Sequence, residues 1–320
     1  MRGNIFNFRV LLIGAILLTA GYLVGIGLNG LVAISPDPVP QAATPTNDGK
    51  LRIICFGAHP DDCELKIGGT AALWAAKGHH VKFVSLTNGD IGHWGMSGPA
   101  LAKRRSDEVQ RGDKLLGVET VILDIHDGEL EPSLTNRRIV TELIREWRAD
   151  MVFSHRPNDY HPDHRYSGVL VQDAAYMVTV PFFCPKTPYL TRNPVFMYYA
   201  DRFERPTSTR ADVVVSIDDS LDKKVAALEL MESQFLEGGA NGNINLIPKD
   251  AAERERRQKQ VREMFISRDA ATAKRFGDRM VALYGAEQAK KISHAEAFEI
   301  CEYGTQPGKE ELKRLFPFVP

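Results

Sequence analysis

Two short segments of the sequence combine histidine with carboxylate side chains. The first, GAHPDDCEL, follows the apolar run LRIICF and contains His59, Asp61, Asp62 and Glu64. Clustered carboxylates repel one another and lose hydration when buried, so such a cluster requires a cation or several hydrogen-bond donors nearby. In the structural alternative, one aspartate caps a helix and Glu64 favours the positive helix N-terminus. Glu64 is interpreted as a supporting or helix-starting residue.

The second segment is HPDH, which contains His161, Asp163 and His164. It comes shortly after the run MVFSH, which ends at His155. If both apolar runs are parallel strands, their carboxyl ends lie at one edge of the sheet and the two segments share a pocket. His155 is close enough in sequence to join that pocket. The other histidines are interpreted as ordinary surface or core residues: His79, His80, His93, His126 and His294.

The residue types in this pocket are those of a catalytic metal site. Two imidazoles and one carboxylate suit zinc with a position left open for water. The same set describes the facial triad of non-haem iron oxygenases, so ligand type leaves the metal open. After three ligands are assigned, an aspartate and a histidine remain, which are the base and acid that metal-assisted hydrolysis needs.

Short apolar runs alternate with helical patterns from residue 51 onward. This alternation predicts an α/β fold, with a Rossmann-like, mostly parallel sheet flanked by helices. The expected strands are 51–57, 81–87, 118–125, 150–155, 195–200 and 212–217, and the expected helices include 67–78, 99–117, 135–149 and 220–235. Residues 238–320 are polar and charged and predict a helical C-terminal extension packed on the catalytic domain, 51–237. The extension could also form a contact between copies of the chain.

The N-terminal part has a different composition. Residues 10–34 carry no charge and are long enough to cross a bilayer, and Arg2 and Arg9 precede them. We expect segment 1–34 to be an uncleaved transmembrane anchor that places the remainder outside the cytoplasm; a cleaved signal peptide would give a secreted protein. Residues 35–50 contain four prolines and predict a linker.

Charge and cysteine content exclude several other classes. A net charge of -1 gives no indication of nucleic-acid binding. The four cysteines form no CxxC pair, so neither a zinc ribbon nor a disulfide scaffold is expected.

The motif AHPDDCE followed by HPDH resembles the PIG-L, or LmbE-like, N-deacetylases. The resemblance runs from Leu51 to about Phe235 and includes LTNGDIG, RSDEVQRGDKLLGV and DKKVAALELMESQ. It implies a zinc enzyme, with one ion per chain, that removes acetyl groups from N-acetylglucosamine conjugates. One departure is that Met231 and Glu232 stand before the SQ pair, where many relatives have a histidine. This difference puts the role of that segment in closing the pocket in doubt.

The resemblance also implies individual roles. His59, Asp62 and His164 would bind the metal. Asp61 would be the general base that takes a proton from the attacking water, and His161 would be the acid that stabilises the oxyanion and protonates the departing amine. Asp163 would keep the His161 imidazole charged and oriented. Contact with the sugar is considered for Arg105 and Glu108, and stacking on it for Trp94, Phe182 or Tyr189.

The sequence therefore predicts a metal-dependent N-deacetylase with a small amino-sugar substrate. Two alternatives remain open. The first is an iron-dependent oxygenase with the same ligands, which would consume oxygen. The second is a glycan-binding relative without turnover, which would bind an N-acetylated sugar and release no acetate.

Overall fold

The computed structural model describes residues 39–44 and 48–320. The predicted anchor, 1–34, lies outside these residues and stays a prediction, as do residues 35–38 and 45–47 of the predicted linker. None of the helices in the described part is both long enough and apolar enough to cross a bilayer. Pro40–Pro320 form one compact unit by their contacts.

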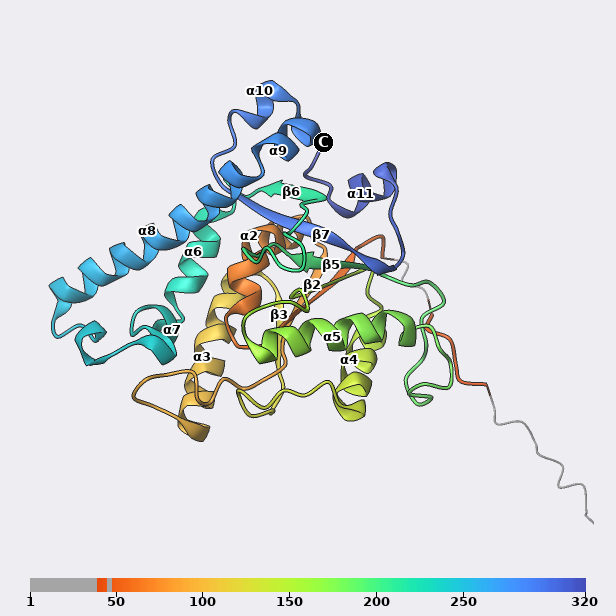
Figure 1. The fold of residues 1–320 in the computed structure, drawn as a ribbon, viewed down its shortest axis with the longest axis horizontal. Coiled ribbons are helices and arrows are strands. Elements are labelled where there is room, and N and C mark those ends of the chain that lie inside the picture. Colours follow the sequence, from red (N-terminus) through yellow and green to blue (C-terminus); the bar gives the residue numbers. More distant parts are fainter. Residues whose placement is uncertain (1–38, 45–47) are drawn as a thin grey trace, which may run out of the picture. The chain divides into compact units, whose positions relative to one another are not determined.

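The core of this unit is a seven-stranded sheet in the order β3-β2-β1-β4-β5-β7-β6 (Figure 1). The strands are β1 (Arg52–Gly57), β2 (His80–Ser85), β3 (Glu119–Ile122), β4 (Met151–Ser154), β5 (Val195–Tyr199), β6 (Val213–Ser216) and β7 (Ala295–Gly304). Neighbouring strands from β3 to β5 are parallel, whereas β7 is antiparallel to both β5 and β6. The predicted mostly parallel α/β fold is confirmed.

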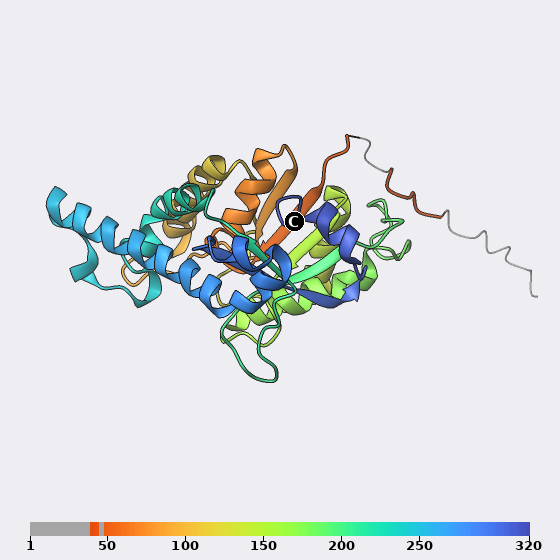
Figure 2. The same cartoon turned by 90° about the horizontal axis from the view of Figure 1, so that it is seen from above.

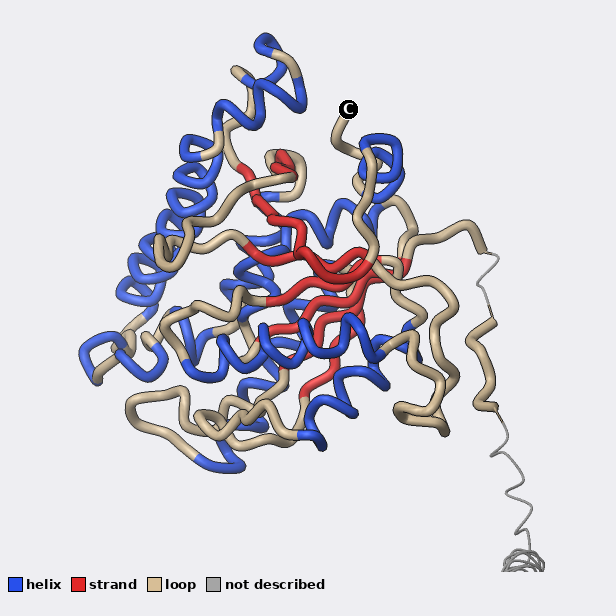
Figure 3. Tube along the Cα trace, turned by 45° about the vertical axis from the view of Figure 1, so that its right-hand side comes forward, coloured by secondary structure: helices blue, strands red, loops and turns tan. Residues whose placement is uncertain are grey.

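Helices cover both faces of the sheet, as Figure 3 shows by colour. The helices before β6 are α2 (Asp62–Ala76), α3 (Gly98–Leu116), α4 (Leu134–Trp147) and α5 (Pro162–Met177). After β6 come α6 (Leu221–Glu229), α7 (Glu232–Phe235), α8 (Ala251–Arg275), α9 (Gly277–Tyr284), α10 (Ala286–Ala289) and α11 (Lys309–Leu315), with short 3₁₀ turns at Gly239–Asn241 and Ile244–Leu246. Helix α8 runs beside α6 and reaches β7 (Figures 1 and 2).

Alternate residues of β1 belong to two separate apolar cores. Ile53 and Cys55 pack with α2, α6 and α11, and Ile54 and Phe56 pack with α4 and α5. A parallel strand buried on both faces must be apolar at nearly every position, which explains the unbroken apolar run IICF at residues 53–56. Local signals bound the helices: α3 has a proline in its first turn, and it ends at Gly117, whose φ of 83° suits glycine.

The C-terminal extension differs from the prediction of a helical appendage. Its segment Ala295–Gly304 is β7, which lies between β5 and β6 and pairs with both. The extension is therefore part of the sheet, although α8 to α11 are helical as predicted.

The strand order places a topological switch point between β1 and β4. From β1 the chain continues to β2 and β3 on one side, and from β4 it continues to β5 on the other. The loops that leave such neighbouring strands separate and open a crevice at their carboxyl ends. Both histidine-containing segments start from these two strands.

Candidate metal centre

His59, Asp62 and His164 come together over the carboxyl ends of β1 and β4. His59 lies in the loop after β1, Asp62 begins α2, and His164 lies in the first turn of α5. Gly57 permits the tight turn, because a Cβ there would lie 2.7 Å from Cβ of Asp62.

The three predicted ligand atoms form a nearly regular triangle. Nδ1 of His59 is 3.2 Å from Nε2 of His164, and each of these nitrogens is 3.5 Å from Oδ2 of Asp62. Ligands of a tetrahedral zinc lie about 2.0–2.2 Å from the ion and therefore roughly 3.4 Å from one another. The spacing thus fits a tetrahedral cation.

Carboxylates behind the two histidines indicate which nitrogen of each ring is free to bind. Nε2 of His59 lies 3.0 Å from Oδ1 of Asp127, and Nδ1 of His164 lies 3.1 Å from Oδ1 of Asp159. A ring N–H that donates to a carboxylate leaves the lone pair on the other nitrogen. Those other nitrogens are the pair that lie 3.2 Å apart. Two facing lone pairs repel each other unless a positive charge lies between them.

The charges around His59 favour such a positive charge. Burial opposes a charged His59, but hydrogen bonds to Asp127, Asp163 and Asp62 outweigh burial and raise its pKa well above the ordinary value. Burial would also raise the pKa of Asp62, yet the neighbouring imidazoles hold it well below its usual range. Asp62 is therefore an ionised carboxylate, and its Oδ2 accepts from the N–H groups of Ala58 and His59 at 2.9 Å each. The donor set fits a divalent metal ion. A proton and the metal ion compete for the free nitrogen of His59.

Other combinations in the same cluster could also hold an ion: His59, His161 and His164; Asp62, His155 and His164; and His59, Asp127 and Asp163. We favour His59, Asp62 and His164 because the remaining carboxylates already accept from the two imidazoles. His155 is 1% exposed, so an ion bound to it would have little access to water or substrate.

Asp61 faces the cavity beside this triangle and is held by Arg105. Nη2 of Arg105 lies 3.3 Å from Oδ2 of Asp61 and donates to the carbonyl of Pro60 at 3.1 Å. Gly89 and Gly92 make room for the guanidinium, since a Cβ on either would lie within 2.4 Å of it. Burial raises the pKa of Asp61 to about 6 although Arg105 opposes the rise. A carboxyl group with this pKa can accept and return a proton near neutral pH.

His161 is the N-cap of α5 and also lines the cavity. Its Nδ1 accepts from the backbone N–H of Asp163 at 3.2 Å, so its proton is on Nε2. The carboxylate of Asp163 lies elsewhere than expected: Oδ2 is 3.3 Å from Nε2 of His59 and accepts from the N–H of Gly128 at 2.7 Å. Asp163 therefore holds His161 through its backbone and His59 through its side chain.

His155, Asp127 and Asp159 complete the centre. The sequence placed His155 near the pocket without giving it a role, and it did not single out the two aspartates. Nε2 of His155 lies 3.2 Å from Oδ2 of Asp62. Burial lowers the pKa of His155 to about 4 despite the attraction of Asp62, so the ring is neutral. All three residues follow strand-like runs, which is the signal that could have identified them.

A cavity of about 580 Å³ opens above the centre. Its lining includes His59, Asp61, Asp62, Arg105, Asp127, Tyr160, His161, His164, Gln234, Phe235 and Arg268. Glu108 lies outside it, and its carboxylate accepts from Ser233 Oγ at 2.6 Å. Trp94, Phe182 and Tyr189 are also outside the lining, so Tyr160 and Phe235 are the aromatic candidates for sugar contact.

The segment next to Met231 and Glu232 does help to close this cavity. Gln234 lines it, and its Nε2 donates to the carbonyl of Gly92 at 3.0 Å. This wall of the cavity is therefore present although no histidine precedes the SQ pair.

Comparison with known proteins shows which family the sequence matches. Residues 54–175 match the family model PIG-L, described as GlcNAc-PI de-N-acetylase. The diacetylchitobiose deacetylase of Thermococcus kodakarensis is 32% identical over 204 residues, which cover 60% of this chain and 73% of that protein.

Two solved structures share the fold. The N,N'-diacetylchitobiose deacetylase of Pyrococcus horikoshii has a TM-score of 0.58 at 24% identity, covering 78% of this chain and 83% of that one. GalB of Pseudomonas putida, a 4-carboxy-2-hydroxymuconate hydratase, has a TM-score of 0.60 at 19% identity, covering 81% and 99%. At these identities the likeness shows the fold alone, and the motifs and the Thermococcus relative carry the assignment. The chain belongs to the PIG-L family.

Proposed function

We propose that the chain is a metal-dependent hydrolase that removes the N-acetyl group from an amino-sugar conjugate, with zinc as the metal. The observation that carries this proposal is the triangle of His59, Asp62 and His164, whose two imidazoles each have a carboxylate behind them. Family membership and the deacetylase relative supply the reaction class.

Residues around this triangle have separate roles in the proposed reaction. A zinc ion held there would supply Lewis acidity toward the amide carbonyl and the attacking water. Asp61 accepts a proton from the water, and Arg105 keeps that carboxylate turned toward the cavity. His161 presents Nε2–H as a donor to the oxygen that gains charge. The role of His161 as the acid for the departing amine rests on the family resemblance.

The experiment combines metal content with acetate release. The purified chain should bind about one zinc and release acetate from N,N'-diacetylchitobiose or another N-acetylglucosamine conjugate, and a chelator should abolish turnover. Asp61→Asn should keep the metal and lose activity by about 10²-fold or more, because the base is removed. His59→Ala combined with His164→Ala should lose both.

Asp124→Asn is the matched control, since that side chain is exposed and contacts Asn88. Wild-type activity in Asp61→Asn, or full zinc content in the double variant, would contradict the assigned roles. Turnover that depends on ferrous iron and oxygen would instead support the oxygenase alternative.

A further inference from the structure

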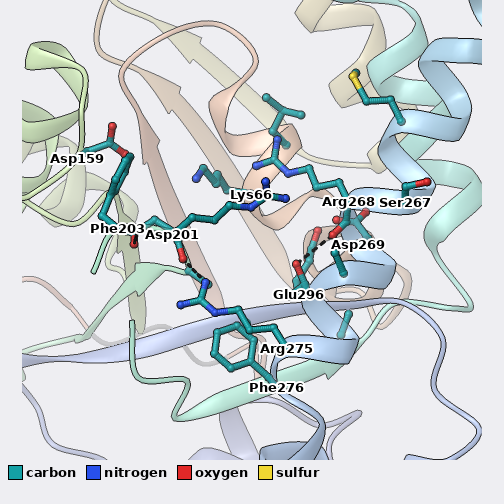
Figure 4. Close-up of a pocket in the computed structure, with 18 of the residues that line it drawn as sticks. Lys66, Asp159, Asp201, Phe203, Ser267, Arg268, Asp269, Arg275, Phe276 and Glu296 are labelled. Atoms are coloured by element: carbon teal, nitrogen blue, oxygen red, sulfur yellow. Dashed lines mark hydrogen bonds between the residues drawn. The ribbon is translucent and has the colours of Figure 1, made fainter. Parts of the chain in front are cut away.

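A second cavity, of about 660 Å³, adjoins the cavity at the metal centre. The two share Leu65, Lys66, Tyr160, His164 and Arg268 in their linings. From this common wall the second cavity extends between the loop after β5 and helix α8, as Figure 4 shows. It is therefore built largely by the C-terminal extension, outside the residues that match the family model.

Three cations in this second cavity have no partner among the described residues. They are Lys66 on α2, Arg202 in the loop after β5, and Arg268 on α8. Lys66 and Arg268 are half-buried, and Figure 4 shows both among the side chains that line the cavity. Within residues 39–44 and 48–320, none of the three side chains makes a hydrogen bond or an ion pair. The fourth cation, Arg275, donates to the carbonyl of Asp201.

The carboxylates that line the same cavity are already paired. Asp159 accepts from His164, and Asp201 lies 3.1 Å from Nη1 of Arg156. The remaining two, Asp269 and Glu296, contact Nζ of the buried Lys224 at 2.9 and 2.8 Å. Lys224, Asp269 and Glu296 together keep one net negative charge. Asp269 directly follows Arg268 on α8. The three do not reach Lys66 or Arg202 in a direct contact.

Unpaired charge in a confined cavity is costly. Burial lowers the pKa of Lys66, and the nearby positive charge of Arg268 lowers it further. Burial likewise lowers the pKa of Arg268. Lys66 and Arg268 are half-buried and Arg202 is exposed, and a bound anion would restore the interactions that the two half-buried cations lose. Arginine and lysine side chains around one cavity are the donors that recognise phosphate and carboxylate groups.

We propose that this second cavity binds an anionic group, a phosphate or a carboxylate, on the sugar conjugate whose acetamide lies at the metal centre. The proposal rests on the proposed deacetylase function. The shared wall allows one ligand to span both cavities, so Lys66 and Arg268 determine substrate specificity rather than take part in the chemistry.

The test compares N-acetylglucosamine derivatives that carry a neutral or an anionic group at C1. The zinc-loaded chain is assayed for acetate release from the neutral methyl glycoside of N-acetylglucosamine, from its glycolic acid glycoside and from N-acetylglucosamine 1-phosphate. Wild type should prefer an anionic compound. Lys66→Met combined with Arg268→Met should lower kcat/KM for that compound by about 10- to 100-fold, as expected for lost charged hydrogen bonds, and should lower it much less for the neutral substrate. The preferred anion identifies phosphate or carboxylate.

Two further variants serve as controls. Arg256→Met removes an exposed cation from the same helix and should leave all substrates unchanged. Lys66→Arg keeps the charge and should retain the preference. An equal loss on neutral and anionic substrates, or wild-type preference for the neutral glycoside, would overturn the proposal.

Direct binding separates this proposal from the function on which it rests. If no compound releases acetate, the proposed function fails, and calorimetric titration with N-acetylglucosamine 1-phosphate and the methyl glycoside still decides the anion site. Tighter binding of the phosphate that disappears in the double variant supports the site. Equal binding, or a preference that survives in the double variant, overturns it.

Discussion

Each of the two histidines predicted to bind the metal has a carboxylate behind it, and this pairing determines which nitrogen of each ring is free for a metal ion. Asp127 lies behind His59 and Asp159 lies behind His164. The sequence motifs identify the two histidines. The carboxylates Asp127 and Asp159 lie in two different loops, and only the folded chain shows which histidine each of them contacts. Because such partners orient a ligand and increase its basicity, they control metal affinity.

At the residue scale, we expect Asp127→Asn and Asp159→Asn each to weaken zinc binding by about 10- to 100-fold. Asparagine keeps the size of the side chain but removes the charge that favours a cation. Competition with a chromophoric chelator measures the change in zinc Kd. Asp124→Asn, an exposed aspartate near Asp127, should not alter the Kd. An unchanged Kd in both site variants would show that the pairing does not support the metal.

Helices α2 and α3 meet through a pair of buried carboxyl groups. Glu64 and Asp113 contact each other, and Asp113 also accepts from Thr120 Oγ1 at 2.6 Å. Burial raises the pKa of Glu64 well above its ordinary value, and the charge of Asp113 raises it further. Burial raises the pKa of Asp113 to about 6. Glu64 therefore holds its proton more tightly than an ordinary glutamate and acts as the donor of the pair.

At the element scale, this pair predicts a pH dependence of stability. The pKa of Asp113 is higher in the folded state, about 6, than its ordinary value of 3.8, so the folded state binds its proton more tightly. Its contribution to the free energy of unfolding is therefore greatest below about pH 4 and is lost as the pH rises toward about 6. Asp113→Asn has no charge to bury and should increase the free energy of unfolding at pH 7 by about 1–3 kcal/mol.

Urea denaturation of wild type and Asp113→Asn at pH values from 4 to 8 measures this effect. The difference between the two proteins should grow from pH 4 to pH 6. Asp107→Asn changes an exposed residue on the same helix and provides the comparison. A constant difference across the range would mean that ionisation of Asp113 is not its cause.

The molecule as a whole does not divide at residue 238, where the polar extension was expected to begin. Strand β7 pairs with β5 and β6, and Trp74 of α2 donates to the carbonyl of Leu315 at 2.8 Å. Lys224 lies buried between Asp269 and Glu296, both of which come from the extension. Residues 51–237 and the extension therefore contribute to one sheet, to the same apolar cores and to the same ion pairs.

At the scale of the whole molecule, we expect residues 40–237 to lack a cooperative unfolding transition. Truncation removes β7 from inside the sheet, and it leaves Lys224 buried without its carboxylates, a loss that typically costs about 3–5 kcal/mol. Residues 40–320 should unfold in a single transition when circular dichroism is followed with temperature. A sharp transition for 40–237 at a similar temperature would show that the extension is dispensable for folding.

The sequence by itself determined the features that local signals carry. Apolar runs and terminal glycines predicted six of the strands and most of the helices, because burial on both faces demands continuous apolar residues. The motifs AHPDD and HPDH predicted the metal ligands, the general base and the acid His161, and these roles stay predictions. Only the tertiary structure showed β7, whose run AEAFEICEYG has charged residues that pair with distant segments. It also decided the partners of Asp163, the places of Arg105 and Glu108, and the cations beside the metal centre. These depend on contacts between residues far apart in the chain, which no local pattern encodes.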